Sequence, residues 1–238
     1  MENRVKREYF LRSSDFDCEN RLSPTAVLDL FQDIASVHAE ELGIGFDSLI
    51  KRNLIWVLVR TKYEQYLSPS RFQKVSVESW PCPPGRAGFS REYLIKNAEG
   101  EVVIKGSSDW VVLDSVARKI VPAADIYPIN DFCTDKNFPE RLRKLPDFEG
   151  EDVYSLTPGF SQLDLNAHVN NTKYANYVLD CETLPRDKKI TSLQIDYRKE
   201  VLSGDRIFMK AKRDEDSLLY KGCDVEGNIL FSCKIDIK

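Results

Sequence analysis

Residues 23–45 read SPTAVLDLFQDIASVHAEELGIG, and this stretch predicts one long amphipathic helix. Ser23 and Pro24 are a favourable N-cap and first helical residue. Apolar residues then recur at the spacing of one helix face, at Val27, Leu30, Phe31, Ile34, Val37 and Leu42. Gly43 and Gly45 end the helix. Because a helix with one apolar side must bury that side, the rest of the chain has to supply a surface that covers it.

Four strand-like segments follow this helix, each rich in β-branched and aromatic residues. They span residues 54–66, 74–80, 88–96 and 102–113. The segments between them, residues 68–69, 81–85 and 99–100, carry the Pro and Gly of turns. The first half is therefore predicted to be one helix followed by a long meander of strands.

The second half repeats this layout. A helix is predicted from about residue 171 to 182, and strands are predicted near residues 191–201, 205–212, 218–225 and 229–237. The turns recur in the same order: residues 67–68 (Leu-Ser) match 202–203, and 99–100 (Glu-Gly) resemble 226–227. Ordered internal similarity of this kind indicates two copies of one structural unit.

Two such units suggest an α+β fold in which each antiparallel sheet wraps around a central helix. A wrapped helix is buried on nearly all sides, and the two sheets can join edge to edge, which hides exposed strand edges. Residues 121–155 are rich in Pro and charge, as a connecting surface segment would be. We predict an N-terminal domain at residues 1–124, a linker at 125–150 and a C-terminal domain at 151–238.

Composition excludes several functional classes. The 238 residues are 42% hydrophobic and 30% charged, as in a globular chain. No stretch approaches the roughly 18 apolar residues of a membrane span, and the charged opening MENRVKREYF differs from a signal peptide, so we expect a cytoplasmic protein. The six cysteines have no metal-ligand or redox spacing and are expected to be reduced. The net charge of −4 argues against a general nucleic-acid binder.

The sequence LDLNAHVNNTKY, residues 163–174, carries the candidate chemistry. Asp164, Asn166 and His168 alternate, so in an extended segment their side chains would share one face. A carboxylate, an amide and an imidazole there, beside the N-terminus of the helix expected near Asn170 and Asn171, would suit acyl transfer, in which a carbonyl oxygen becomes negative. The spacing alone is equally compatible with Asp164 and Asn166 only shaping a turn and Asn170 capping the helix.

This block closely resembles the signature of acyl-acyl-carrier-protein thioesterases, the plant and bacterial enzymes that end fatty-acid synthesis. A variant of D-x-N-x-H-V-N-N is shared with other hotdog thioesterases, so the paired halves and matches in the first half narrow the resemblance to this family. The first-half matches are Ile55-Trp56-Val57, Ser79-Trp80, Gly85-Arg86, Arg91, Ser108-Asp109-Trp110-Val111 and Arg118-Lys119.

The resemblance implies a double hotdog fold, hydrolysis of fatty acyl thioesters of acyl carrier protein, and an acyl chain held largely by the N-terminal repeat. It implies no metal and no bound cofactor. Plant members carry a transit peptide, and because the opening residues do not resemble one, we expect this chain to be similar to the bacterial members. The oligomeric state, monomer or homodimer, stays open at this point. A coenzyme A thioesterase, a hotdog dehydratase and a non-catalytic acyl-chain sensor are the rival interpretations.

The resemblance also assigns roles to four residues. Glu200 lies in a block similar to the family strand that brings a carboxylate to the site, and without the family it would be interpreted as a solvent-facing charge. Val201 follows it where many plant members have cysteine, so a thiolate nucleophile is excluded there. We expect water activated by Glu200 with His168, a thioester held or polarised by Asn166, and neighbours oriented by Asp164. Which of Glu200 and His168 acts as the general base stays open at this point, and so does a covalent glutamyl-acyl intermediate.

The first copy of the unit provides an internal comparison. An ungapped alignment of the two helix starts places residues 17–21 (DCENR) opposite residues 164–168 (DLNAH). The first copy keeps the Asp but has Glu19 and Arg21 at the positions of Asn166 and His168. Because it lacks the amide and the group that titrates near neutral pH, we expect chemistry in the second copy only.

Several other residues receive structural or partner interpretations. His38 is interpreted as a packed, hydrogen-bonded histidine, and Trp56, Trp80 and Trp110 as core residues of strands. Residues 183–213 hold nine Lys/Arg and four Asp/Glu. Because acyl carrier protein is strongly acidic, a basic surface near the site would attract it. The candidates for that surface are Lys188, Lys189, Arg198 and Lys199, with Lys188 and Lys189 preferred.

Overall fold

The computed structural model describes residues 3–86, 88–126, 132–181, 184 and 187–238. The strands are β1 (Val5–Phe10), β2 (Leu54–Gln65), β3 (Lys74–Pro81), β4 (Phe89–Lys96), β5 (Val102–Asp114), β6 (Lys119–Ile120), β7 (Glu151–Leu156), β8 (Ile190–Tyr197), β9 (Ile207–Arg213), β10 (Ser217–Cys223) and β11 (Ile229–Ile237). The helices are α1 (Pro24–Glu41), α2 (Phe46–Ile50) and α3 (Tyr174–Leu179), with 3-10 turns η1 (Ser13–Asp15), η2 (Ala123–Asp125), η3 (Phe160–Gln162) and η4 (Asn171–Lys173). Within these residues, no helix is long and apolar enough to cross a membrane.

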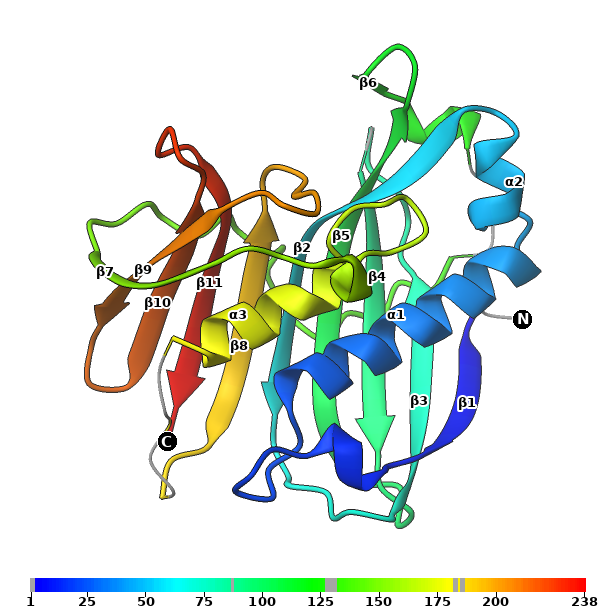
Figure 1. Ribbon diagram of the computed structural model, residues 1–238. Coiled ribbons are helices and arrows are strands. Elements are labelled where there is room, and N and C mark those ends of the chain that lie inside the picture. The colour runs from blue at the N-terminus through cyan, green and yellow to red at the C-terminus, as the bar shows by residue number, and fades with distance from the viewer. Residues whose placement is uncertain (1–2, 87, 127–131, 182–183, 185–186) are drawn as a thin grey trace.

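The described strands form one continuous antiparallel sheet (Figure 1). Its order is β1-β3-β4-β5-β2-β8-β11-β10-β9-β7, with β6 paired to β5. The strands of the first half therefore stay together, and so do those of the second half. The two groups meet where β2 pairs with β8, for example Arg60 opposite Asp196 and Glu64 opposite Ser192. The expected edge-to-edge joining of two tandem hotdog units is confirmed.

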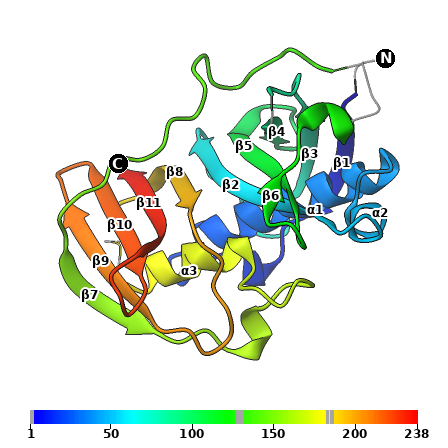
Figure 2. The same ribbon diagram turned by 90° about the horizontal axis from the view of Figure 1, so that it is seen from above.

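Both helices predicted from the sequence lie on the same side of the curved sheet (Figures 1 and 2). Helix α1 begins at Pro24, with the Ser23 hydroxyl accepting the Ala26 N–H. Val27, Phe31 and Ile34 of its apolar stripe are buried. Helix α3 lies beside it, and the two are linked by a hydrogen bond from the Thr25 hydroxyl to the Asn176 amide oxygen. The apolar side chains of the two helices and of both strand groups form one continuous core.

Gly106 on β5 allows α1 to approach the sheet closely. A Cβ at this position would lie 2.2 Å from Cε2 of Phe31, a distance that two carbon atoms cannot share. The Phe31 ring instead lies over the bare glycine and stacks on Tyr93, with ring centroids 4.2 Å apart. The central helix can therefore sit directly on the sheet, as the wrapped arrangement requires.

Residues 132–150 cross the opposite face of the sheet as an extended segment (Figure 2). Three of its apolar side chains, Phe138, Leu142 and Leu145, are buried. Arg60 donates a hydrogen bond to the Leu142 carbonyl, and Asp196 accepts one from the Leu145 N–H. The connection is therefore packed on the sheet at the β2–β8 junction.

The predicted and observed elements differ in the edge strands of the sheet and in the ends of individual elements. All eight predicted strands exist, with ends shifted by a few residues. The edge strands β1 and β7 were not predicted, because each has one solvent-exposed face and carries charged residues instead of a regular apolar alternation. The predicted second helix is shorter: a 3-10 turn at Asn171–Lys173 continues into α3, which ends at Leu179. Residue 182, the expected end, lies outside the described residues.

Candidate active site

The segment that carries Asp164, Asn166 and His168 is a tight turn rather than an extended strand. One carboxylate oxygen of Asp164 accepts the backbone N–H of Asn166 at 2.8 Å and of His168 at 3.2 Å. The Asp164 N–H donates to the His168 carbonyl at 2.8 Å, and Ala167 has a φ of +60°. The expectation that an extended backbone aligns the three side chains is therefore wrong. The Asp164 carboxylate is used inside the turn, where it sets the backbone positions of the other two residues.

The first half contains the same turn. Asp17 accepts the backbone N–H groups of Glu19 and Arg21, both at 2.9 Å, and its own N–H donates to the Arg21 carbonyl. Asn20 has a φ of +60°, the value found at Ala167. The alignment of residues 17–21 with 164–168 is thus reproduced bond by bond. The Arg21 guanidinium donates to Asp17 at 2.7 Å, so this copy of the turn holds a guanidinium where the other copy has an imidazole.

The turn is tied to the strand region that carries Glu200. His168 forms a β-bridge with Leu202, and the Val169 N–H donates to the Val201 carbonyl at 2.8 Å. These contacts bring the His168 Nε2 atom to 3.4 Å from a Glu200 carboxylate oxygen. The structure therefore brings His168 to Glu200, the predicted site residue that lies outside the turn at residues 164–168.

The helix N-terminus beside the turn is already capped. The Asn170 side chain accepts the N–H and the hydroxyl of Thr172 at 3.0 and 3.1 Å. The backbone N–H of Thr172 therefore already has an acceptor. The capping role that the sequence left open for Asn170 is the one observed.

Arg118 is a further residue at this site, and it comes from the first half of the chain. Its guanidinium donates to the other carboxylate oxygen of Glu200 at 2.8 Å. Arg118 follows the turn between β5 and β6, in which Asp114 accepts the N–H groups of Val116 and Ala117, and its φ is +54°. Sequence reasoning noted Arg118 only as part of a family match. Its contact with Glu200 spans 82 residues, so no local pattern could have predicted it.

A cavity of about 190 Å³ opens next to the turn. It lies between α1, α2 and neighbouring parts of β2, β3, β4 and β5. Among its described lining residues, Asn166 comes from the second half of the chain. Its lining residues are Ala35, Ser36, Ala39, Glu40, Ile44, Gly45, Phe46, Leu49, Leu54, Ile55, Trp56, Pro81, Phe89, Ser90, Arg91, Trp110 and Asn166. A largely apolar pocket in the first half thus ends at the polar turn of the second half.

The tryptophans divide between core and cavity. Trp80 is buried, as interpreted from the sequence. Trp56 and Trp110 are half-buried and line the cavity, with their rings perpendicular to each other and centroids 6.4 Å apart. The interpretation of these two as core residues alone was incomplete, because a pocket wall and a strand core both require large apolar groups.

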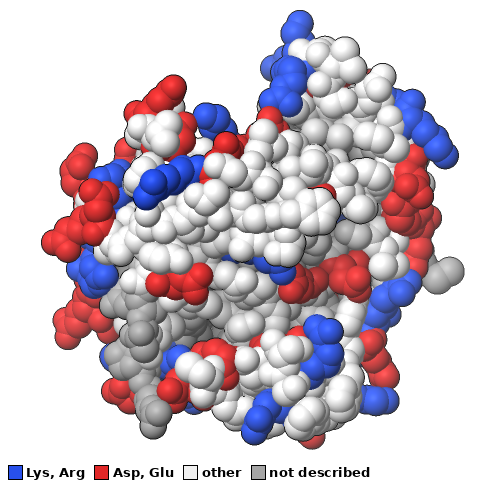
Figure 3. All heavy atoms as spheres, in the orientation of Figure 1, with Lys and Arg blue, Asp and Glu red and all other residues white. Residues whose placement is uncertain are grey.

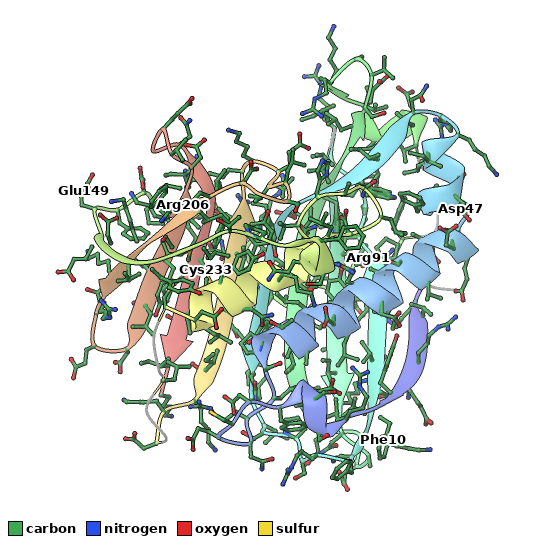
Figure 4. The ribbon with its side chains drawn as sticks, in the orientation of Figure 1. Phe10, Asp47, Arg91, Glu149, Arg206 and Cys233 are labelled. Atoms are coloured by element: carbon green, nitrogen blue, oxygen red, sulfur yellow. The ribbon has the colours of Figure 1, made fainter. Side chains whose placement is uncertain are left out.

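His38 is packed and hydrogen-bonded, as interpreted. Its Nδ1 lies 3.0 Å from Arg91 and its Nε2 lies 3.1 Å from the Asn3 side-chain oxygen. Burial, and then the positive charge of Arg91, lower the pKa of His38 to about 4. Arg91 lies beside α1 (Figure 4) and also lines the cavity. His38 is therefore neutral at physiological pH and connects α1 to β4 behind the cavity wall.

The preferred basic residues lie far from this site. Lys188 and Lys189 precede β8, whereas Glu200 follows it. Eight strand residues separate them, which corresponds to roughly 26 Å along an extended strand. The expectation that Lys188 and Lys189 border the site is therefore wrong, because they lie at the end of β8 opposite to the end that leads to Glu200. Lys199 does lie near Glu200, but its ammonium pairs with Asp224 at 3.0 Å.

The buried cysteines are poor nucleophile candidates. Cys82, Cys133, Cys223 and Cys233 are buried, and Cys233 lies in the sheet behind α3 (Figure 4). Burial raises the pKa of the Cys82 thiol to about 12 and raises the pKa values of Cys223 and Cys233 as well. Because the thiolate is the nucleophilic form, a raised pKa disfavours Cys82, Cys223 and Cys233 as nucleophiles.

Comparison with known proteins gives consistent matches over both halves. The family models described as the Acyl-ACP thioesterase N-terminal domain and C-terminal domain match residues 2–128 and 147–236. The oleoyl-acyl carrier protein thioesterase 2 of Arabidopsis thaliana is 29% identical over 84% of this chain, and the palmitoyl-acyl carrier protein thioesterase of Gossypium hirsutum is 29% identical over 82%. This chain spans 60% and 51% of the lengths of those two proteins.

Solved structures agree in fold. An acyl-ACP thioesterase from Bacteroides thetaiotaomicron has a TM-score of 0.91 at 22% identity, over 99% of this chain and 98% of that chain. The 12:0-ACP thioesterase from Umbellularia californica has a TM-score of 0.81 at 25% identity, over 100% of this chain and 98% of that chain.

Proposed function

The chain belongs to the acyl-ACP thioesterase family, and on that premise we propose that it hydrolyses fatty acyl-acyl-carrier-protein thioesters to free fatty acid and carrier protein. In this reaction a water oxygen bonds to the thioester carbon, the carbon–sulfur bond breaks, and the leaving thiolate takes up a proton. Release of the free acid would end chain growth in fatty-acid synthesis. The reaction needs a pocket for an acyl chain and, at its mouth, groups that activate water and polarise a carbonyl.

The observation that carries this proposal is the junction of cavity and polar turn. Asn166 lines the apolar cavity, and His168, which is paired with Glu200, follows Asn166 by two residues in the same turn. A thioester carbonyl beside Asn166 would place its acyl chain in the cavity of the first half. The second half would then supply the chemistry, which is the division of labour we propose for the N-terminal domain (1–124) and the C-terminal domain (151–238).

Each of the four predicted residues has a proposed role that suits its contacts. Glu200 and His168, 3.4 Å apart, would share the activation of water and the return of a proton to the leaving thiolate. The Asn166 amide would hold or polarise the thioester carbonyl. Asp164 would act through the backbone, because its carboxylate already accepts the N–H groups of Asn166 and His168. Attack by Glu200 itself, through a glutamyl-acyl intermediate, is the alternative course.

A ladder of thioesters tests the reaction and its rivals. Purified protein is offered acyl-carrier-protein and acyl-coenzyme A substrates of several chain lengths, and the released acids are identified. We expect free fatty acids, with higher kcat/KM for carrier-protein substrates. A preference for coenzyme A would support the coenzyme A thioesterase instead. Conversion of 3-hydroxyacyl to enoyl thioesters would support a dehydratase, and binding without turnover would support an acyl-chain sensor.

The cytoplasmic location stays a prediction from the sequence, and cell fractionation tests it. The choice between monomer and homodimer also stays open until the mass in solution is measured.

A further inference from the structure

Five cationic residues gather above the cavity on the first half of the molecule. They are Lys51, Arg52, Arg86, Arg118 and Lys119, and all five are exposed. We call this set the basic crown. In Figure 3, blue atoms lie at the tip of the β5–β6 turn and on the upper right beside α2.

Three contacts hold the segments of the basic crown together. The Arg52 guanidinium donates to the Asp125 carbonyl at 2.9 Å, and the Ala123 N–H donates to the Arg86 carbonyl at 3.2 Å. The Ser115 N–H donates to the Asn53 carbonyl at 2.8 Å. Segments that are distant in the sequence therefore form one surface, and its cations are held near one another.

The positive charge of the basic crown is only partly balanced. Its segments, residues 51–53, 86 and 114–125, contain two acidic residues, and one of these, Asp114, has a carboxylate oxygen engaged in the β5–β6 turn. Among the described residues, Lys51, Arg86 and Lys119 have no ion-pair partner. The protein as a whole has a net charge of −4, so the positive charge of the basic crown is a local feature. Such a local excess of positive charge can attract an acidic partner.

The basic crown borders the proposed site directly. Arg118 contacts Glu200, Lys51 follows the cavity-lining Leu49 by two residues, and Arg86 precedes the cavity-lining Phe89 by three. Two large apolar side chains, Val116 and Ile120, flank the cations of the β5–β6 turn and are 75% and 55% exposed. Exposed apolar groups interleaved with cations are typical of a surface that binds a partner.

We propose that the basic crown is the surface on which an acidic carrier protein docks, so that its thioester enters the cavity beside Asn166. This inference rests on the proposed thioesterase function and adds the place of docking. Because exposed charges act over only about 8–10 Å at physiological ionic strength, cations at the site edge can steer the partner, whereas Lys188 and Lys189 are too distant.

Charge reversal tests the docking surface. The variant Lys51→Glu/Arg86→Glu/Lys119→Glu leaves Arg118 and Glu200 unchanged. We expect the KM for an acyl-carrier-protein substrate to rise about tenfold or more, with kcat nearly unchanged, and we expect the effect to shrink as salt is added. With acyl-pantetheine, a small uncharged thioester, kcat/KM should stay within about twofold of the wild type.

The matched control is Lys144→Glu/Lys188→Glu/Lys189→Glu, which changes the net charge by the same amount on other surfaces. It should leave both substrates nearly unaffected. A milder variant, with Gln at residues 51, 86 and 119, should give an intermediate KM and serves if the Glu variant is unstable.

An unchanged KM for the carrier-protein substrate in both crown variants, or an equal loss with acyl-pantetheine, would overturn the docking surface. An equal rise in the KM for the carrier-protein substrate in the control variant and in the crown variants would also overturn the docking surface. If the wild type hydrolyses acyl-pantetheine but the crown variants lose no activity specific to the carrier-protein substrate, the docking proposal fails and the proposed function stands. If the wild type hydrolyses no thioester, the proposed function itself fails.

Discussion

At the scale of single residues, one carboxylate organises the backbone of the candidate site. Asp164 accepts two backbone N–H groups of its own turn, and Asp17 does the same in the first half. The two turns differ in the side chains they present. An amide and an imidazole stand in the second copy, and Glu19 and Arg21 stand in the first. The comparison separates the backbone turn, which both copies share, from the side chains on it, on which the proposed chemistry depends.

This difference predicts the outcome of alanine substitutions. His168→Ala and Asn166→Ala should each lose at least about a hundredfold in kcat, the scale of general acid–base or oxyanion contacts, while the protein stays folded. The matched change Glu19→Ala should leave kcat within about twofold. Steady-state rates with acyl-pantetheine, together with Tm, provide the measurement. Equal damage from Glu19→Ala in a folded protein would contradict the single-site interpretation.

Arg118 is expected to act as a positioning residue for Glu200. An exposed ion pair is worth up to about 1 kcal/mol, so Arg118→Gln should lower kcat for acyl-pantetheine about fivefold without raising KM. Arg118→Lys should recover part of that loss because it keeps the charge. The neighbouring substitution Lys119→Gln is the control and should have no effect on this substrate. A loss that appears in KM alone, or no loss in either variant, would rule out the positioning role.

At the scale of elements, α1 is anchored through a neutral histidine. His38 contacts Arg91 on β4 and Asn3 near the N-terminus, and the nearby Glu41 carboxylate only partly offsets the effects of burial and of Arg91 on its pKa. The anchor fixes α1, and α1 forms part of the cavity wall. The charge state of one side chain is thus coupled to the position of a whole element.

The stability of the fold should depend on pH through His38. Its pKa is about 4 in the folded protein and about 6.5 in an unfolded chain. Below pH 6.5 the unfolded chain binds a proton that the folded protein does not, so stability should fall as the pH decreases from about 6.5 to about 4 and then level off. The loss attributable to His38 should approach about 3 kcal/mol.

The measurement is Tm against pH for the wild type and for His38→Gln, which cannot titrate. The variant should have a smaller decrease in Tm between pH 6.5 and 4. Parallel curves for the two proteins would show that His38 does not carry this dependence.

At the scale of the whole molecule, the two halves are joined so that one supplies the pocket and the other the polar turn. The β2–β8 pairing makes one sheet, and the Arg118–Glu200 contact links the halves at the site. Neither half contains both the cavity and the His168–Glu200 pair. The proposed activity should therefore respond to changes in the first half according to acyl chain length.

Filling the cavity tests this coupling. Ala39→Leu adds carbon atoms to the cavity wall on α1. It should lower kcat/KM for long acyl chains about tenfold or more relative to short ones, because one methylene group accommodated in an apolar pocket is worth about 1–3 kcal/mol. Ala98→Leu, on an exposed turn, is the control and should leave the chain-length profile unchanged. An equal loss for all chain lengths after Ala39→Leu would mean that the cavity does not hold the acyl chain.

The sequence by itself determined the helices, the eight core strands and the duplication, because these depend on local periodicity, turn residues and capping. Residues 23–45 predict α1 closely, with Ser23 as its cap. The position of Asp164, Asn166 and His168 beside a helix start was also predicted from neighbouring residues. Even so, the local pattern was compatible with two backbone shapes, and the extended one proved wrong.

Only the tertiary structure decided what meets across the chain. The pairing of β2 with β8, the contact of Arg118 with Glu200 and the opening of the cavity onto Asn166 all join residues that are far apart in the sequence. Strand order and register set which ends of the strands share an edge, and no local pattern encodes that order. The same geometry separates Lys188 and Lys189 from Glu200 and brings Lys51, Arg86 and Lys119 to the edge of the site instead.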